Sequence, residues 1–268
     1  MGYIKEIITC LSNKLAESIS GFISYHFFSK KNLVFILGSM RSGSTLLKAL
    51  LAEAQDVSNL PEVKLGAYSV TYGKYTIFYK LSKLSKKRVI IIKNPAFFYC
   101  PRYPDIQINR ARIIVLFRDP CDTVISLQNV IKLPFQSEEI KNLGNKELVN
   151  YWVQVYENIV NNKKLMNNNR VVFVKYEDLL KEPEKITEKL FKFIGSKQRF
   201  GVASYKKPDN YEWKWGKDDG GDKIKTLKVL EKTKYDKNRR REVLKIINSS
   251  SRIKSLMARL NNNTKRIM

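Results

Sequence analysis

The sequence predicts an α/β fold, a P-loop-like three-layer sandwich in which helices cover both faces of a central parallel sheet. The first observation is a set of apolar runs that are short and continuous, as buried strands are. The second is that helical patterns separate these runs, and this alternation is typical of a parallel sheet with right-handed crossovers. The third is a Gly/Ser-rich turn between the first strand and the helix after it. The predicted strands are 33–37, 88–93, 112–118 and 171–175.

The 268 residues form a single predicted domain with three parts. We expect an amphipathic helix over residues 1–30, a core over 33–195, and a C-terminal loop and helices over 196–268. The first helix is too polar to cross a bilayer and has no signal-peptide core, which favours a cytoplasmic protein. Its basic flank, Lys30 and Lys31, leaves peripheral membrane contact as an alternative.

The formal net charge is +25, and such a field attracts nucleotides, nucleic acid, acidic glycans or an anionic membrane. Much of this charge is lysine, and asparagine is abundant too, so a compositional bias explains the charge without any one partner. The cysteines, Cys10, Cys100 and Cys121, form neither a disulfide framework nor a metal-binding pattern. We therefore predict a reducing compartment and no metal site.

The turn after the first strand has the spacing of a phosphate-binding loop. Residues 38–45, GSMRSGST, fit the pattern G-x-x-x-x-G-K-[ST] except that Ser44 replaces the lysine. The first N–H groups of a helix lack intrahelical acceptors and favour a bound anion. That lysine reaches the β- and γ-phosphates of a nucleoside triphosphate, so its loss argues against a triphosphate, and Arg41 supplies the cation instead. The alternative is a Ser-rich turn before a core helix.

Two cations follow the next strands, at the edge of the sheet where parallel α/β proteins bind ligands. Lys93 ends the second strand, which Asn94 and Pro95 then break. It is either a catalytic or phosphate-contacting cation or a plain strand terminator. Arg118 ends the third strand, where a P-loop NTPase typically carries an acidic metal ligand, and it suits a second phosphate. Ser126, about two turns into the next helix, adds a hydroxyl.

Other segments are less specific. Glu62 lies on the connection after the loop helix, where a carboxylate is either solvated or a general base. Asp119 either caps the following helix or pairs with Arg118. Helices are predicted over 147–165 and from Pro183 to Gly195. Three stretches are expected to select the acceptor, but none contains a motif that identifies it: 68–79, 130–145 and 213–222.

Together, four motifs resemble the sulfotransferases that use 3′-phosphoadenosine 5′-phosphosulfate (PAPS). Residues 41–47, RSGSTLL, resemble the 5′-phosphosulfate loop of that family, and 118–120, RDP, with Ser126 downstream resemble its 3′-phosphate motif. Residues 93–95, KNP, resemble its strand-end lysine segment. The later signature is represented by 176–179 (YEDL), Pro183 and 193–195 (FIG), so that order and spacing hold over about 33–195.

This resemblance implies an enzyme that transfers a sulfuryl group in line from PAPS to an acceptor hydroxyl or amine, without a metal. It implies that Arg118 and Ser126 hold the 3′-phosphate and that Tyr176 lies near the adenine. Lys93 would stabilise charge in the transition state. The 5′-phosphosulfate is assigned to Arg41 and to the backbone N–H groups of Ser42, Gly43, Ser44, Thr45 and Leu46.

One departure from the family pattern concerns the catalytic base. Small-molecule members carry a histidine just after the strand-end lysine, where this chain has Pro95, and His26 lies before the loop. Glycan- and protein-modifying members use a glutamate after the loop helix, and Glu62 matches that placement. The resemblance therefore implies Glu62 as the base and a carbohydrate or peptide as the acceptor, with a glycan precursor favoured.

Two other functions stay open. A P-loop nucleotide or sugar kinase would share the strand, loop and helix, but it predicts magnesium dependence and the loop lysine that is missing here. A basic nucleic-acid-binding module would use the net charge and predicts steeply salt-dependent binding. No recognition motif for nucleic acid is present, so we expect no such partner.

Overall fold

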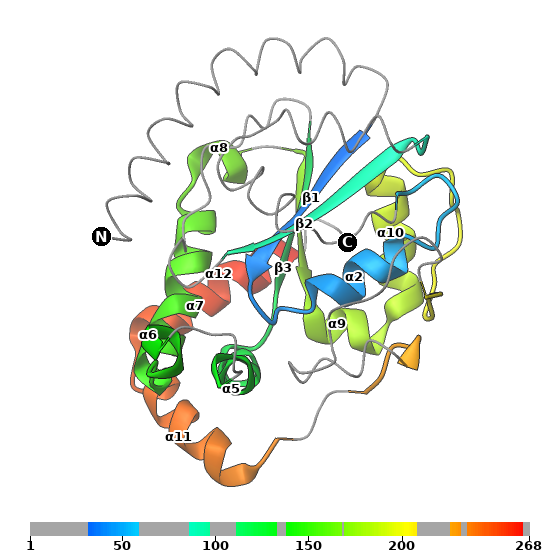
Figure 1. Cartoon of the computed structure of the whole chain (residues 1–268). Coiled ribbons are helices and arrows are strands. Elements are labelled where there is room, and N and C mark those ends of the chain that lie inside the picture. The colour runs from blue at the N-terminus through cyan, green and yellow to red at the C-terminus, as the bar shows by residue number, and fades with distance from the viewer. Residues whose placement is uncertain are drawn as a thin grey trace.

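A four-stranded parallel sheet forms the centre of the molecule in the computed structural model (Figure 1). The structure describes residues 32–58, 86–96, 111–132, 138–167, 169–207, 226–231 and 235–264. The strands are β1 (Asn32–Ser39), β2 (Val89–Ala96), β3 (Arg112–Phe117) and β4 (Val171–Lys175). Their order is β2-β1-β3-β4, and every neighbouring pair is parallel.

Alternate residues of each strand pack into two separate hydrophobic cores, because successive side chains point to opposite faces of a sheet. In β1, Phe35 and Leu37 belong to one core, whereas Val34 and Ile36 belong to the other. Since both faces are buried, the strands are apolar throughout rather than alternating. The three-layer α/β fold predicted from the sequence is confirmed.

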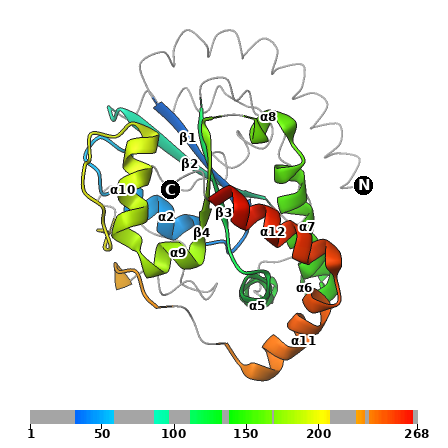
Figure 2. The same cartoon turned by 180° about the vertical axis from the view of Figure 1, so that it is seen from behind.

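Helices cover both faces of the sheet (Figures 1 and 2). One layer contains α2 (Ser44–Leu51), α9 (Tyr176–Lys181) and α10 (Pro183–Ile194). The other contains α5 (Pro120–Ile131), α7 (Asn145–Val160), α11 (Lys237–Asn248) and α12 (Ser251–Thr264). Two short helices, α6 (Glu138–Lys141) and α8 (Lys163–Met166), precede and follow α7 in the chain.

Several element boundaries differ from the prediction, and two of the differences have a clear physical cause. The second strand does not stop before Asn94 but continues to Ala96, which pairs with Ser39 of β1. β2 ends the strand order of the described sheet, and an edge strand tolerates a proline because one of its sides lacks a ladder partner. The helix predicted over 147–165 is two helices, because Asn162 leaves the helix and caps α8 by accepting from Leu165 N at 3.2 Å.

The predicted limits of α10 are confirmed. Pro183 occupies the first helical turn, where a missing N–H costs nothing. Gly195 ends the helix with a φ of 73°, in the left-handed region that favours glycine.

Several predictions concern residues outside the described ranges, namely the helix 1–30, Glu62, the stretch 68–79 and the loop 213–222. Within the described ranges, no helix combines the length and the apolar composition that crossing a membrane requires.

The strand order places a topological switch point beside β1. The chain moves from β1 to β2 on one side and then crosses to β3 on the other. In open α/β sheets, ligands bind at the carboxyl ends of the strands beside such a point. The loops that follow β1 and β3 therefore lie where a ligand site is expected.

Candidate functional site

The phosphate loop connects β1 to α2 through a left-handed glycine. Gly43 precedes the helix with a φ of 95°, and a Cβ there would lie 2.3 Å from the Tyr176 ring, so only glycine fits. The first helical hydrogen bond runs from Leu47 N to Gly43 O at 3.1 Å, which leaves the N–H groups of residues 44–46 without an intrahelical acceptor. The N-terminus of α2 therefore presents the donors that an anion-binding site requires.

The amide of Ser42 does not belong to this set. Ser42 N donates to Ser39 O at 3.3 Å and closes the turn from β1 into the loop. The predicted group of backbone donors, Ser42 to Leu46, therefore narrows to residues 43–46. Ser42 contributes to the shape of the loop instead.

Two tyrosines of α7 fix the start of the loop. Tyr156 is fully buried, donates to Leu116 O at 2.9 Å and accepts from Ser39 N at 3.2 Å. Tyr151 accepts from Met40 N at 2.8 Å. Burial raises the pKa of Tyr156 from 10.0 to about 12, so its hydroxyl stays protonated. Sequence reasoning gave neither tyrosine a role at the site.

Arg41 lies inside the loop in an unusual backbone conformation. Its φ is 64°, in the left-handed region that few non-glycine residues adopt. Its side chain donates from Nε to Ser126 Oγ at 3.0 Å, which joins the loop after β1 to α5. Two residues predicted to hold different phosphates are therefore in direct contact.

Arg118 follows β3 and is only 6% exposed. It donates from one terminal nitrogen to Arg41 O at 3.3 Å and from the other to the Tyr235 hydroxyl at 3.0 Å. Its guanidinium carbon also lies 4.8 Å from the centre of the Tyr176 ring, within the range of a cation–π interaction. Burial raises the pKa of Tyr176, and the Arg118 cation opposes that rise. Sequence reasoning missed Tyr235, because no motif surrounds it.

Lys93 belongs to β2, which lies on the other side of β1 from β3. It ends the apolar part of β2 and donates from Nζ to Thr45 Oγ1, in the first turn of α2, at 2.5 Å. Lys93 is thus brought to the helix terminus whose N–H groups lack intrahelical acceptors. Of the predicted site residues, only Glu62 lies outside the described part of the chain.

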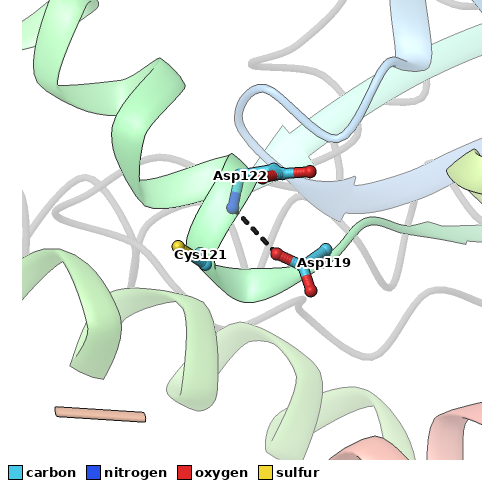
Figure 3. A group of neighbouring side chains, drawn as sticks. All are labelled: Asp119, Cys121 and Asp122. Carbon is cyan, nitrogen blue, oxygen red and sulfur yellow. Dashed lines mark hydrogen bonds between the residues drawn. The ribbon is translucent and has the colours of Figure 1, made fainter. Parts of the chain in front are cut away.

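Asp119, Cys121 and Asp122 lie together at the start of α5, with potential ligand atoms within 4.8 Å of one another (Figure 3). Their interactions are structural. Asp119 Oδ1 accepts from Asp122 N at 2.9 Å and caps α5. Capping was one of the two roles predicted for Asp119. Asp122 forms an ion pair with Arg240 of α11, and Cys121 Sγ lies 3.8 Å from the Arg240 carbonyl oxygen.

The chain is similar to known proteins in two respects, its sequence and its fold. Residues 69–198 match the model of the sulfotransferase family. No curated protein sequence matches the chain at a significant level.

Three solved structures that share the fold are a sulfotransferase and two sulfotransferase domains. The sulfotransferase domain of the Synechococcus PCC 7002 olefin synthase superposes with a TM-score of 0.54 at 18% identity, covering 81% of this chain and 95% of that domain. The sulfotransferase domain from the curacin biosynthetic pathway gives 0.52 at 17% identity, with 81% and 98% covered. A sulfotransferase from Alicyclobacillus acidocaldarius gives 0.53 at 13% identity, with 89% and 97% covered. The match of residues 69–198 to the sulfotransferase family and the shared fold together support the resemblance predicted from the motifs, without resolving a subtype.

Proposed function

We propose that this enzyme transfers a sulfuryl group from PAPS to an acceptor hydroxyl or amine. The observation that carries the proposal is the meeting of Arg41, Ser126 and Arg118 at the switch point of the sheet, linked by hydrogen bonds of 3.0 and 3.3 Å. Two guanidinium groups and a free helix N-terminus suit a ligand with two separate anionic groups. PAPS carries both a 5′-phosphosulfate and a 3′-phosphate.

The residues present fit the donor at both ends. The backbone N–H groups of residues 43–46, together with Arg41 and Lys93, would receive the 5′-phosphosulfate. Arg118 and Ser126 would receive the 3′-phosphate. Tyr176 lies against the loop and Arg118, and its ring would contact the adenine. Ser44 replaces the lysine of a triphosphate loop, which is consistent with a donor that has no γ-phosphate.

The transfer breaks the bond between sulfur and the bridging oxygen of the 5′-phosphate while the acceptor oxygen or nitrogen bonds to sulfur. The acceptor proton goes to a general base, for which we propose Glu62. The electron pair of the broken bond stays on the departing phosphate, and Lys93 beside Thr45 would stabilise that developing charge. Since cations and N–H dipoles meet this charge, the reaction needs no metal, and turnover should be insensitive to EDTA.

The acceptor is the less constrained part of the proposal. We favour a glycan precursor or another carbohydrate, because the chain has Pro95 where small-molecule sulfotransferases carry a histidine base. A panel of sulfate-free oligosaccharides, with small phenols as the comparison, would test this preference. Faster sulfation of the phenols would reject the carbohydrate assignment while leaving the donor assignment intact.

Calorimetric titration separates the donor proposal from its two rivals. We expect 3′-phosphoadenosine 5′-phosphate (PAP), the product nucleotide, to bind more tightly than ATP with Mg²⁺ or a mixed-sequence DNA oligonucleotide. Arg118→Ala should weaken PAP binding tenfold or more, since a hydrogen bond to a charged group contributes about 1.5–3 kcal/mol. Preferential binding of ATP–Mg²⁺ would instead favour a kinase.

A further inference from the structure

The C-terminal segment reaches the donor site even though it lies beyond the family match, which ends at residue 198. Tyr235, just before α11, accepts a hydrogen bond from Arg118 at 3.0 Å, with 117 residues between them in the chain. Its ring centre is 5.9 Å from the guanidinium carbon. Arg118 therefore contacts two tyrosines, one on α9 and one at the start of the C-terminal helices.

Not every N–H donor of Arg118 has an acceptor among the described residues. A guanidinium group has five N–H donors, and the two bonds to Arg41 O and to the Tyr235 hydroxyl leave donors over. Its Nε is buried and has no acceptor among the described residues, while the whole residue is only 6% exposed. An unpaired donor of a buried cation is costly, so this position favours an anionic ligand that would accept from it.

The hydroxyl of Tyr235 can donate a hydrogen bond to the same ligand. Because it accepts from Arg118, its own proton points to a different acceptor. A phosphate monoester bound by Arg118 offers oxygen acceptors close to that hydroxyl. The aromatic ring meanwhile restricts the orientation of the guanidinium group, which makes its planar donors ready for bidentate binding.

Tyr235 is held in place by the attachment of α11 to α5. Asp236 caps α11 by accepting from Asn238 N and Arg239 N, both at 3.0 Å. Arg239 donates to Gln128 Oε1 of α5 at 2.6 Å. The ion pair of Arg240 with the fully buried Asp122 adds a second connection between these helices. The helix that carries Ser126 thus also anchors the residue that contacts Arg118.

We propose that Tyr235 is a 3′-phosphate-binding residue that also positions Arg118. The proposal rests on the proposed function, because it assigns the 3′-phosphate of the donor to this place. Tyr235 holds one terminal nitrogen of Arg118 and donates its own O–H to a phosphate oxygen. It makes the C-terminal segment part of nucleotide recognition.

The test is the ratio of two affinities measured by calorimetry on the full chain: PAP, and adenosine 5′-phosphate, which lacks the 3′-phosphate. Tyr235→Phe keeps the ring and removes the hydroxyl, so the affinity for PAP should fall about tenfold while that for adenosine 5′-phosphate stays within about twofold. Tyr235→Gln offers an acceptor and a donor, and it should recover part of the loss. Tyr235→Leu offers neither and should lose the most.

Arg252→Gln is the matched control, because it breaks a contact of the C-terminal helices, the exposed pair between Arg252 and Glu157, that includes no residue assigned to the donor. It should leave both affinities unchanged. A Tyr235→Phe enzyme that keeps the wild-type ratio overturns the role of Tyr235, as does equal behaviour of the Gln and Leu variants. If the wild type itself binds the two nucleotides equally, the donor assignment fails first, and the two failures are thereby distinguished.

Discussion

Arg41 combines a strained backbone with a side chain that we propose binds the donor. A non-glycine residue at a φ of 64° costs on the order of 1–3 kcal/mol and persists only where its surroundings hold it. Here Arg118 donates to the Arg41 carbonyl oxygen and Ser126 accepts from its Nε. The strain places a cation inside a tight loop in which a glycine would fit with less cost.

Arg41→Gly should therefore weaken PAP binding without lowering the stability of the protein. Glycine relieves the left-handed strain, so the melting temperature should stay near the wild-type value or rise, although the bond to Ser126 is lost. The affinity for PAP should fall about tenfold, because a charge-assisted contact is removed. Thermal melts and calorimetry on the same preparation measure both effects.

Arg41→Lys is the control for this prediction, since it keeps the charge and the strain. It should retain most of the affinity and none of the stability gain. A glycine variant that melts well below the wild type and still binds PAP normally would contradict the prediction.

The proposed base and the proposed charge-stabilising lysine act on rate. Glu62→Gln keeps the shape of the side chain and removes its proton acceptor, so kcat should fall by about 10²–10⁴ while PAP affinity hardly changes. Lys93→Ala should also lower kcat, because its Nζ lies 2.5 Å from Thr45 Oγ1, beside the anion-binding end of α2. Single-turnover sulfation assays would separate these rate effects from binding.

Glu53→Gln is the comparison for the base. Glu53 is a nearby carboxylate whose Oε1 accepts from Lys206 N at 2.6 Å, so it has a structural contact of its own. The comparison variant should keep its turnover. Full activity in Glu62→Gln would place the base elsewhere.

At the scale of elements, α5 connects the loop after β1 to the C-terminal helix α11. Its N-terminus is capped by Asp119, its middle carries Ser126, and its buried face holds Asp122 against Arg240 of α11. Asp122 is fully buried, whereas the Arg240 side chain is 30% exposed. The pair therefore fixes α11 to α5, the helix that carries Ser126.

Arg240→Met should destabilise the protein by about 1–3 kcal/mol, because it removes a charged partner from a buried carboxylate. Urea denaturation followed by circular dichroism measures the change. Arg252→Gln is the contrast, since the Arg252 side chain is 58% exposed and its pair with Glu157 should contribute only about 0–1 kcal/mol. Equal losses in the two variants would show that burial of Asp122 does not decide the effect.

The elements could be predicted from the sequence where a local signal defines them. Continuous apolar runs identified all four strands, and Pro183 with Gly195 identified α10. The end of β2 could not be predicted, because pairing with β1 overrides the local effect of Pro95. The split between α7 and α8 depends on the cap formed by Asn162, which a run of helix-compatible residues conceals.

The site residues also divide into those that a local sequence signal predicts and those that it does not. Arg41, Arg118 and Ser126 follow strands in short motifs, so the sequence places them together. Tyr151, Tyr156 and Tyr235 contact the site across 111, 117 and 117 residues of chain, and nothing in their own neighbourhoods indicates it. Such contacts follow only from the packing of helices on the sheet.

At the scale of the whole molecule, buried tyrosines make stability sensitive to alkaline pH. Burial raises the pKa of Tyr156 and of Tyr205 from 10.0 to about 12. The unfolded chain releases these protons near pH 10, whereas the folded protein keeps them, so raising the pH favours unfolding. Their contribution is fully present below pH 10 and is lost as the pH rises through about 12.

Tyr156→Phe should lose part of this sensitivity. The variant is less stable at neutral pH, because it lacks the bond to Leu116 O. Its difference in unfolding free energy from the wild type should shrink between pH 10 and about 12, on the order of 2–3 kcal/mol in all. Denaturant titrations at several pH values measure this difference, and a difference that stays constant would contradict the assigned pKa.

The pairing of Asp122 with Arg240 also has a consequence for the newborn chain. The two residues are 118 positions apart, so at 5–20 residues per second the ribosome needs roughly 6–24 s to deliver the arginine after the aspartate. During that interval β4 is still being made, and the Asp122 carboxylate lacks the Arg240 cation. Without that cation water must keep solvating the carboxylate, and the layer around α5 stays open until α11 emerges. A nascent chain stalled before residue 235 should therefore be sensitive to proteases at α5.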